Sequence, residues 1–116
     1  MKKLLEELSY KGCDVNRGIE RSMGREDYYI ERLKRFAESD YVDKLDQAYA
    51  SRDLKKCRLY ACSLESSCFS LGLKPMYYLS SNIINLAGRS KYSDLGIVLE
   101  RLKTYQQGYI SILNAQ

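Results

Sequence analysis

The chain has 116 residues, the length of one domain that can bury a hydrophobic core of its own. Apolar residues make up 45% of it and charged residues 29%, a balance that excludes a disordered or fibrous protein. The net charge of +4 is small, and the lysines and arginines are interspersed with acids, so no nucleic-acid-binding surface is expected.

The first residues of the chain do not have the pattern of an export signal. Two lysines follow the initial methionine, but Glu6 and Glu7 stand where a signal peptide would carry its apolar segment. No apolar run approaches the ~20 residues that a membrane-spanning helix needs. We therefore expect a cytoplasmic protein without a membrane span, whose four cysteines are reduced.

Helical periodicity dominates the first half of the chain. A short helix is predicted near Lys3–Leu8. Asp14 is predicted to cap a second one, Val15–Ser22, which Gly24 ends in a left-handed conformation. A long helix is predicted from about Asp27 to Ala50. Its apolar residues recur at steps of three and four and share one face: Ile30, Leu33, Phe36, Ala37, Tyr41, Leu45 and Ala48.

The clearest pattern of the chain begins just after residue 50. Ser51 or Asp53 can cap a helix over Leu54–Leu71, and Gly72 can end it. The apolar residues of this helix form an unbroken seam of the kind that faces a bundle core. The seam residues are Leu54, Cys57, Ala61, Leu64, Cys68 and Leu71.

Two more helices follow. Pro75 can open the first of them, and Gly88 can end it, with Met76, Leu79, Ile83 and Leu86 inward. Ser93 or Asp94 can start the last helix, whose seam is Leu95, Val98, Leu102, Tyr105, Tyr109 and Ile112. Short loops make consecutive helices antiparallel neighbours. The sequence thus predicts an all-α fold in which residues 1–116 form a single domain, an antiparallel up-down four-helix bundle with a short N-terminal helical extension.

The four cysteines do not have the spacing of a metal site. They stand at positions 13, 57, 62 and 68, and the chain has no histidine, so neither a metal nor a cofactor is expected. Cys57 and Cys68 lie on the predicted seam roughly 16 Å apart along one helix, too far for a mutual disulfide. Cys62 is one position past Ala61 and is expected to face solvent, either as an inert surface thiol or as a reactive one.

The segment Ala61-Cys62-Ser63-Leu64-Glu65-Ser66-Ser67 and the helix end at Leu71-Gly72 resemble the signature of histidine-phosphotransfer (Hpt) domains. Ala61 matches the small residue before the phospho-accepting histidine, Leu64 the leucine, and Ser67, Leu71 and Gly72 the later positions. The likeness extends over nearly the whole chain. The upstream residues that fall where the family tends to place similar ones are Asp14, Gly18, Gly24, Tyr28 or Tyr29, Leu33, Phe36 and Asp53.

Three departures from the Hpt pattern fall on one patch. Cys62 occupies the histidine position, Glu65 that of the family lysine, and Ser66 that of the family glycine. The resemblance implies that the histidine forms a phosphoramidate, that the lysine attracts the transferring phosphoryl group, and that the glycine permits close approach. With all three replaced, phosphotransfer is not expected. No residue is assigned a catalytic role, and we do not expect the protein to be an enzyme.

The resemblance implies a non-catalytic interaction module of two-component or phosphorelay signalling. The expected partner is the receiver domain of a response regulator, or a histidine-kinase component. The residues expected to contact it are Lys55, Arg58, Cys62, Glu65, Ser66 and Phe69. Two alternatives stay open: a thiol or redox-sensing protein that uses Cys62, and a structural helical bundle outside signalling.

Overall fold

The computed structural model describes residues 2–115, and these are folded almost entirely into helices, with no strand among them. This confirms the all-α class. The seven helices of the described part are α1 (Lys2–Tyr10), α2 (Val15–Glu20), α3 (Glu26–Ala37), α4 (Tyr41–Ala50), α5 (Leu54–Leu71), α6 (Lys74–Gly88) and α7 (Tyr92–Asn114).

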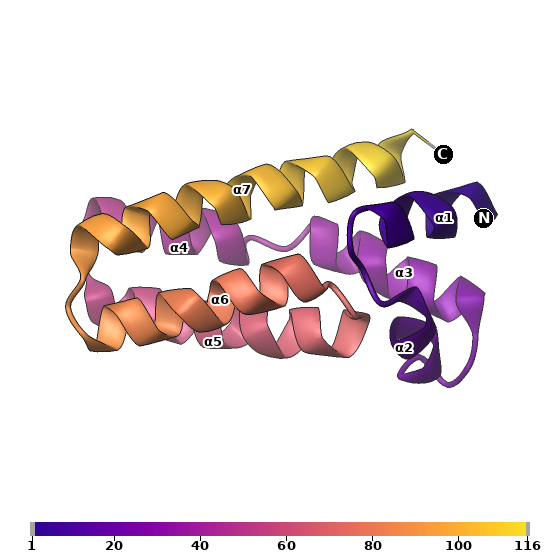
Figure 1. Cartoon of the computed structure of the whole chain (residues 1–116), viewed down its shortest axis with the longest axis horizontal. Helices are drawn as coiled ribbons and strands as arrows, with labels where there is room; N and C mark the ends of the chain where they lie inside the picture. Colours follow the sequence, from indigo (N-terminus) through magenta and orange to yellow (C-terminus); the bar gives the residue numbers. More distant parts are fainter. Residues whose placement is uncertain (1, 116) are drawn as a thin grey trace.

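The longer helices lie side by side along the long axis of the molecule (Figure 1). Helix α5 packs against α4 and α6, α6 packs against α7, and α7 also contacts α3 and α4. Figure 1 shows α6 running back along α5 and α7 running back along α6. Helix α1 lies beside α7, while the short α2 packs on α5. Three N-terminal helices are therefore gathered at one end of the molecule (Figure 1).

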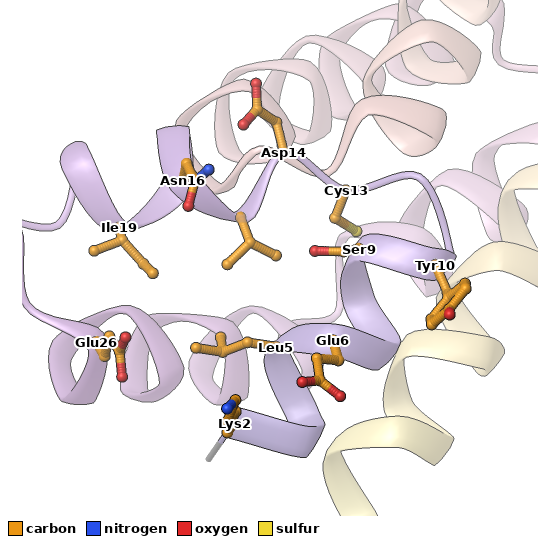
Figure 2. A pocket seen from close by; sticks show the side chains of 11 residues that line it. Lys2, Leu5, Glu6, Ser9, Tyr10, Cys13, Asp14, Asn16, Ile19 and Glu26 are labelled. Carbon is orange, nitrogen blue, oxygen red and sulfur yellow. The ribbon is translucent and has the colours of Figure 1, made fainter.

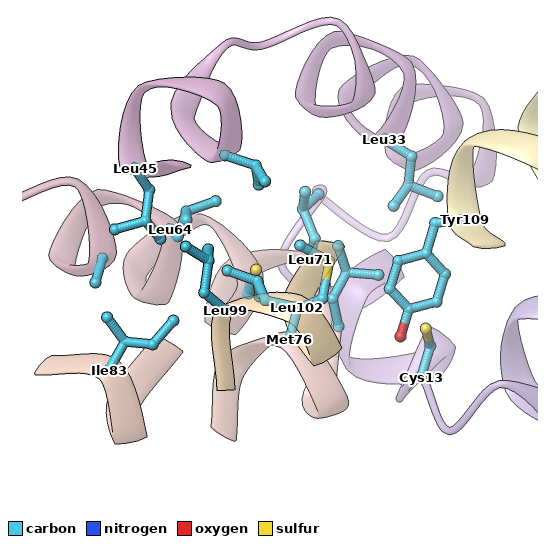
Figure 3. Packing of buried hydrophobic residues seen from close by; sticks show 14 of the residues in the cluster. Cys13, Leu33, Leu45, Leu64, Leu71, Met76, Ile83, Leu99, Leu102 and Tyr109 are labelled. Atoms are coloured by element: carbon cyan, nitrogen blue, oxygen red, sulfur yellow. The ribbon is translucent and has the colours of Figure 1, made fainter. Parts of the chain in front are cut away.

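The predicted seam of α5 faces the core. Cys57, Ala61, Leu64 and Cys68 are fully buried and Leu71 nearly so, whereas Leu54, in the first turn, is half-buried. In Figure 3, Leu64 and Leu71 lie among Leu45, Leu99 and Leu102. The bounds of α5 also agree with the prediction. Asp53 provides the cap, because its carboxylate accepts the amide of Lys56 at 3.1 Å, and Gly72 ends the helix with φ +71°.

The prediction of one helix from Asp27 to Ala50 is wrong. The chain leaves the helix after Ala37 and re-enters it at Tyr41. The hydroxyl of Ser39 donates to the carbonyl of Phe36 at 2.7 Å, so a side chain satisfies a backbone group at the end of α3. Asp40 then occupies the N-cap position of α4, where aspartate is favoured over the helix interior. Helices α3 and α4 therefore take the place of the one long helix.

The buried faces of α6 and α7 differ in detail from the predicted seams. Leu79 and Leu86 of α6 are only half-buried, and Ser80 and Ala87 are buried in their stead. On α7, Tyr105 is 38% exposed. Helix α7 contacts α1, α3, α4 and α6, so its buried face is broader than a single seam. The additional buried residues of α7 are Leu99, Gln106 and Leu113.

Helix α2 meets the end of α5 at an unusually close junction, which we call the α2–α5 junction. The amide of Asp14 donates to the carbonyl of Gly72 at 2.7 Å, and the buried hydroxyl of Tyr29 donates to the carbonyl of Leu71 at 2.8 Å. A Cβ on Gly18 would lie 2.6 Å from Cζ of Tyr29 and 2.7 Å from the Leu71 carbonyl oxygen, and a Cβ on Gly72 would overlap the carbonyl of Asp14. Only glycine fits at these two points.

Candidate functional site

The solvent-facing side of α5 gathers all six residues that the sequence singled out for partner binding. A helix that buries residues at steps of three and four leaves the intervening positions on its opposite face. We call this surface the α5 stripe. It extends for roughly 21 Å along the helix. Its residues are Lys55, Arg58, Cys62, Glu65, Ser66 and Phe69, all of them exposed except Glu65, which is half-buried.

The N-terminal end of the α5 stripe is cationic. Lys55 and Arg58 are both exposed. Neither forms an ion pair with another residue of the described part of the chain. Their charges are therefore not neutralised locally and can attract an acidic surface on another molecule.

The middle of the α5 stripe carries Cys62, Glu65 and Ser66. The hydroxyl of Ser81, on α6, donates to the Glu65 carboxylate at 2.5 Å, so Glu65 is directed toward the neighbouring helix. Cys62 and Ser66 are exposed one turn apart. The middle of the α5 stripe therefore presents a carboxylate, a thiol and a hydroxyl.

An exposed aromatic ring closes the C-terminal end of the α5 stripe. Phe69 is 53% exposed, and the guanidinium carbon of Arg21 lies 4.1 Å from its ring centroid. Arg21 also donates to the carbonyl of Phe69 at 2.6 Å, and the ring of Tyr77 is 5.7 Å from the Phe69 ring. These contacts, from the residue that follows α2 and from α6, hold the ring in place and leave about half of it exposed.

The sequence prediction missed Leu59. This side chain is 61% exposed and stands three residues before Cys62, so it belongs to the same face. The exposure of Leu59 could have been predicted from the sequence, because this large apolar residue lies outside the seam of α5. Tyr78 of α6, 63% exposed, is a second large side chain outside the predicted set, and its ring lies 5.4 Å from that of Tyr77.

Cys62 is the exposed cysteine of the chain, and the other three are buried. Burial raises the pKa of the Cys13 thiol to about 11, and it raises the pKa of Cys57 and Cys68 as well. A buried thiol of raised pKa is a poor nucleophile, because the thiolate is the reactive form. Within the described residues, no group of three or more cysteines and carboxylates is placed to hold a metal ion.

We expect a thiol reagent to modify the native protein once. An aromatic disulfide reagent should react with Cys62 at the rate of an ordinary accessible thiol, and with the remaining three cysteines only after unfolding. The absorbance of the released chromophore gives the number of reactive thiols, measured once in buffer for the native protein and once in denaturant for the unfolded protein. The variant Cys62→Ser should show no rapid reaction and an unchanged helical spectrum. Rapid modification of two or more thiols in the native state would contradict the burial of the others.

Comparison with known proteins identifies no relative. No protein-family model matches the chain, and neither the curated proteins nor the solved structures that were searched contain a match. Among residues 2–115, no helix has the length and apolar character needed to cross a membrane.

Proposed function

We propose that this protein is a degenerate Hpt domain that binds the receiver domain of a response regulator, or a histidine-kinase component, without transferring a phosphoryl group. In this proposal α3 and α4 together, α5, α6 and α7 are the four members of an antiparallel bundle, and α1 and α2 are its N-terminal extension. The protein would act in the cytoplasm as an interaction module of two-component signalling.

Residues that resemble the Hpt pattern and residues that depart from it lie in different parts of the structure, and this separation is the main support for the proposal. Of the residues that resemble the Hpt pattern, Asp14, Gly18, Leu71 and Gly72 come together in the α2–α5 junction, with Tyr29, one of the two tyrosines that could correspond to the family position. The departures from the pattern, in contrast, all lie on the α5 stripe. A scaffold retained beneath an altered surface is what we expect of a domain that has kept its binding role and lost its chemistry.

The α5 stripe has the composition of a protein-binding surface. Leu59 and Phe69 supply exposed apolar area at either side of Cys62, and aromatic residues are enriched at the centres of interfaces. Lys55 and Arg58 supply charge complementary to the acidic pocket of a receiver domain. Glu65 opposes phosphoryl transfer, because a carboxylate repels the transferring group.

Charge reversal on the α5 stripe should weaken receiver binding. Arg58→Glu and Lys55→Glu are each expected to cost about 1 kcal/mol, which is roughly a fivefold rise in Kd, with a larger effect at low salt. Lys34→Glu, an exposed site on α3, is the matched control and should leave Kd unchanged. Titration of the receiver domains of the native host by calorimetry measures each value. If neither stripe variant differs from the control, the contact surface lies elsewhere.

The wild-type protein should acquire no phosphoryl label from an active histidine kinase or from a phosphorylated receiver. The combined substitution of Cys62→His, Glu65→Lys and Ser66→Gly should permit an acid-labile label, because it restores the nucleophile, the charge and the close approach on a retained scaffold. The single variant Cys62→His should be labelled more slowly than the triple variant, because it still lacks the lysine and the glycine. Radiolabelled phosphate followed on gels measures all three. A stoichiometric label on the wild type would overturn the proposal.

Replacing Cys62 alone separates this proposal from a thiol function. Cys62→Ser should bind the receiver as the wild type does, since the hydroxyl keeps the size and polarity of the thiol. Binding that depends on the oxidation state of Cys62, and is lost in the serine variant, would favour the redox-sensing alternative.

A further inference from the structure

A groove outside the α5 stripe has an apolar floor and an acidic rim, features typical of a binding site. It lies between α1 and α2, borders the first turn of α3, and has a volume of about 820 Å³. In Figure 2, the side chains of Leu5 and Ile19 point into this space from opposite sides. We call it the α1–α2 groove. None of the residues that line it belongs to the α5 stripe.

The floor of the α1–α2 groove is apolar and only partly covered. Val15 is buried, but Leu5 and Ile19 are half-buried although they pack against the core. Tyr10, at one end of the groove, is 93% exposed, more than any other large apolar or aromatic side chain among the described residues. A molecule that covered this surface would gain about 25 cal/mol for each Å² of apolar area removed from water.

The rim of the α1–α2 groove is acidic on a protein whose net charge is positive. Glu6, Asp14 and Glu26 line it against the single cation Lys2, which leaves a local charge of −2, whereas the whole chain carries +4. Asp14 has Lys74 at 3.8 Å. Glu6 and Glu26, in contrast, form no ion pair within the described residues. Two carboxylates at the edge of an apolar floor therefore lack a cationic partner.

We propose that the α1–α2 groove binds an amphipathic helix of a partner protein whose apolar face is flanked by lysine or arginine. The apolar side chains of such a helix would cover Leu5 and Ile19, and its basic flanks would meet Glu6 and Glu26. An anionic membrane surface does not fit, because the rim would repel it. This site is independent of receiver binding. It would let one small domain hold two partners on surfaces that share no residue.

An 18-residue fluorescent helix of leucine and lysine, arranged with one apolar face, is the direct probe. Its counterpart has glutamate in place of every lysine. The lysine peptide should bind the full-length protein and shift the amide resonances of Leu5, Val15 and Ile19, whereas the glutamate peptide should bind at least about tenfold more weakly. Anisotropy gives the affinities, and heteronuclear NMR gives the location.

Two double variants with the same change in total charge test the role of the rim. Glu6→Lys with Glu26→Lys should weaken the lysine peptide about tenfold, and Glu38→Lys with Asp43→Lys, both exposed and away from the groove, should change it less than about twofold. Tyr10→Ala provides a further test that does not threaten folding, because the side chain is already in solvent, and it should weaken binding severalfold.

Four results would overturn the proposal. These are equal effects of the two double variants, equal binding of the two peptides, resonance shifts that map outside the groove, and binding only to vesicles of anionic lipid. Failure of receiver binding in the experiments above would leave this result unaffected, since the peptide and its variants probe a different face.

Discussion

Gly18→Ala is expected to lower the free energy of unfolding by about 3 kcal/mol. The new methyl group would overlap the ring of Tyr29 and lie 2.7 Å from the carbonyl oxygen of Leu71. Neither neighbour can yield easily, because the ring is fully buried and the carbonyl belongs to the backbone. Overpacking of this kind costs about 1–3 kcal/mol, and displacement of the Tyr29 hydroxyl from Leu71 adds about 1 kcal/mol.

Gly88→Ala is the matched control for this substitution. Gly88 is also helical, but a Cβ there would meet no atom within 4 Å, so alanine should leave stability unchanged or raise it slightly. Urea unfolding followed by circular dichroism gives both values. If Gly18→Ala and Gly88→Ala have equal stabilities, the close approach at the α2–α5 junction does not hold in solution.

The protein should lose several kcal/mol of stability between about pH 8.5 and pH 11. Burial raises the pKa of Cys13 to about 11, from a value of 9.0 for a free thiol. Between these two pH values the unfolded chain releases the proton and the folded chain keeps it, so each further rise in pH favours unfolding. A difference of two pH units corresponds to roughly 3 kcal/mol. Burial raises the pKa of Cys68, Tyr29 and Tyr109 too, which adds to the loss.

Urea unfolding at pH 7.5, 9 and 10.5 under reducing conditions measures this loss. Cys13→Ala should reduce the loss of stability between pH 7.5 and pH 10.5 by about 2 kcal/mol, because one of the buried thiols that titrate on unfolding is removed. Cys62→Ser, which changes the exposed cysteine, is the matched control. Equal unfolding free energies at pH 7.5 and 10.5 would show that these thiols and phenols are accessible to water.

The parts of the fold that were predictable from sequence are those with local signals. The bounds of α5 could be read from the capping Asp53 and the left-handed Gly72, and its core face from the spacing of its apolar residues. The break between α3 and α4 could not, because Phe36, Ala37 and Tyr41 continue the helical periodicity across it. The hydroxyl of Ser39 donates to the carbonyl of Phe36 at this break, and the spacing of apolar residues carries no information about such a bond.

The same distinction applies to the candidate site. The exposure of Cys62 followed from its place one residue past the seam, whereas the stacking of Arg21 on Phe69 joins residues 48 positions apart and depends on where α2 docks. The α1–α2 groove is also invisible in the sequence, because it is a space between helices. Local pattern therefore predicted which face of α5 is free, and tertiary packing determined what surrounds it.

The core-packing residues of α5 and the residues of its outer surface can be changed independently, which makes this helix suited to protein engineering. Its core face packs against the neighbouring helices through Cys57, Ala61, Leu64 and Cys68, all inaccessible to solvent. Its outer face could be randomised at Lys55, Arg58, Cys62 and Ser66 without touching that packing. Surface substitutions of this kind usually change stability by less than about 0.5 kcal/mol. A combinatorial library at these four codons would therefore yield folded members in which binding specificity varies while the scaffold does not.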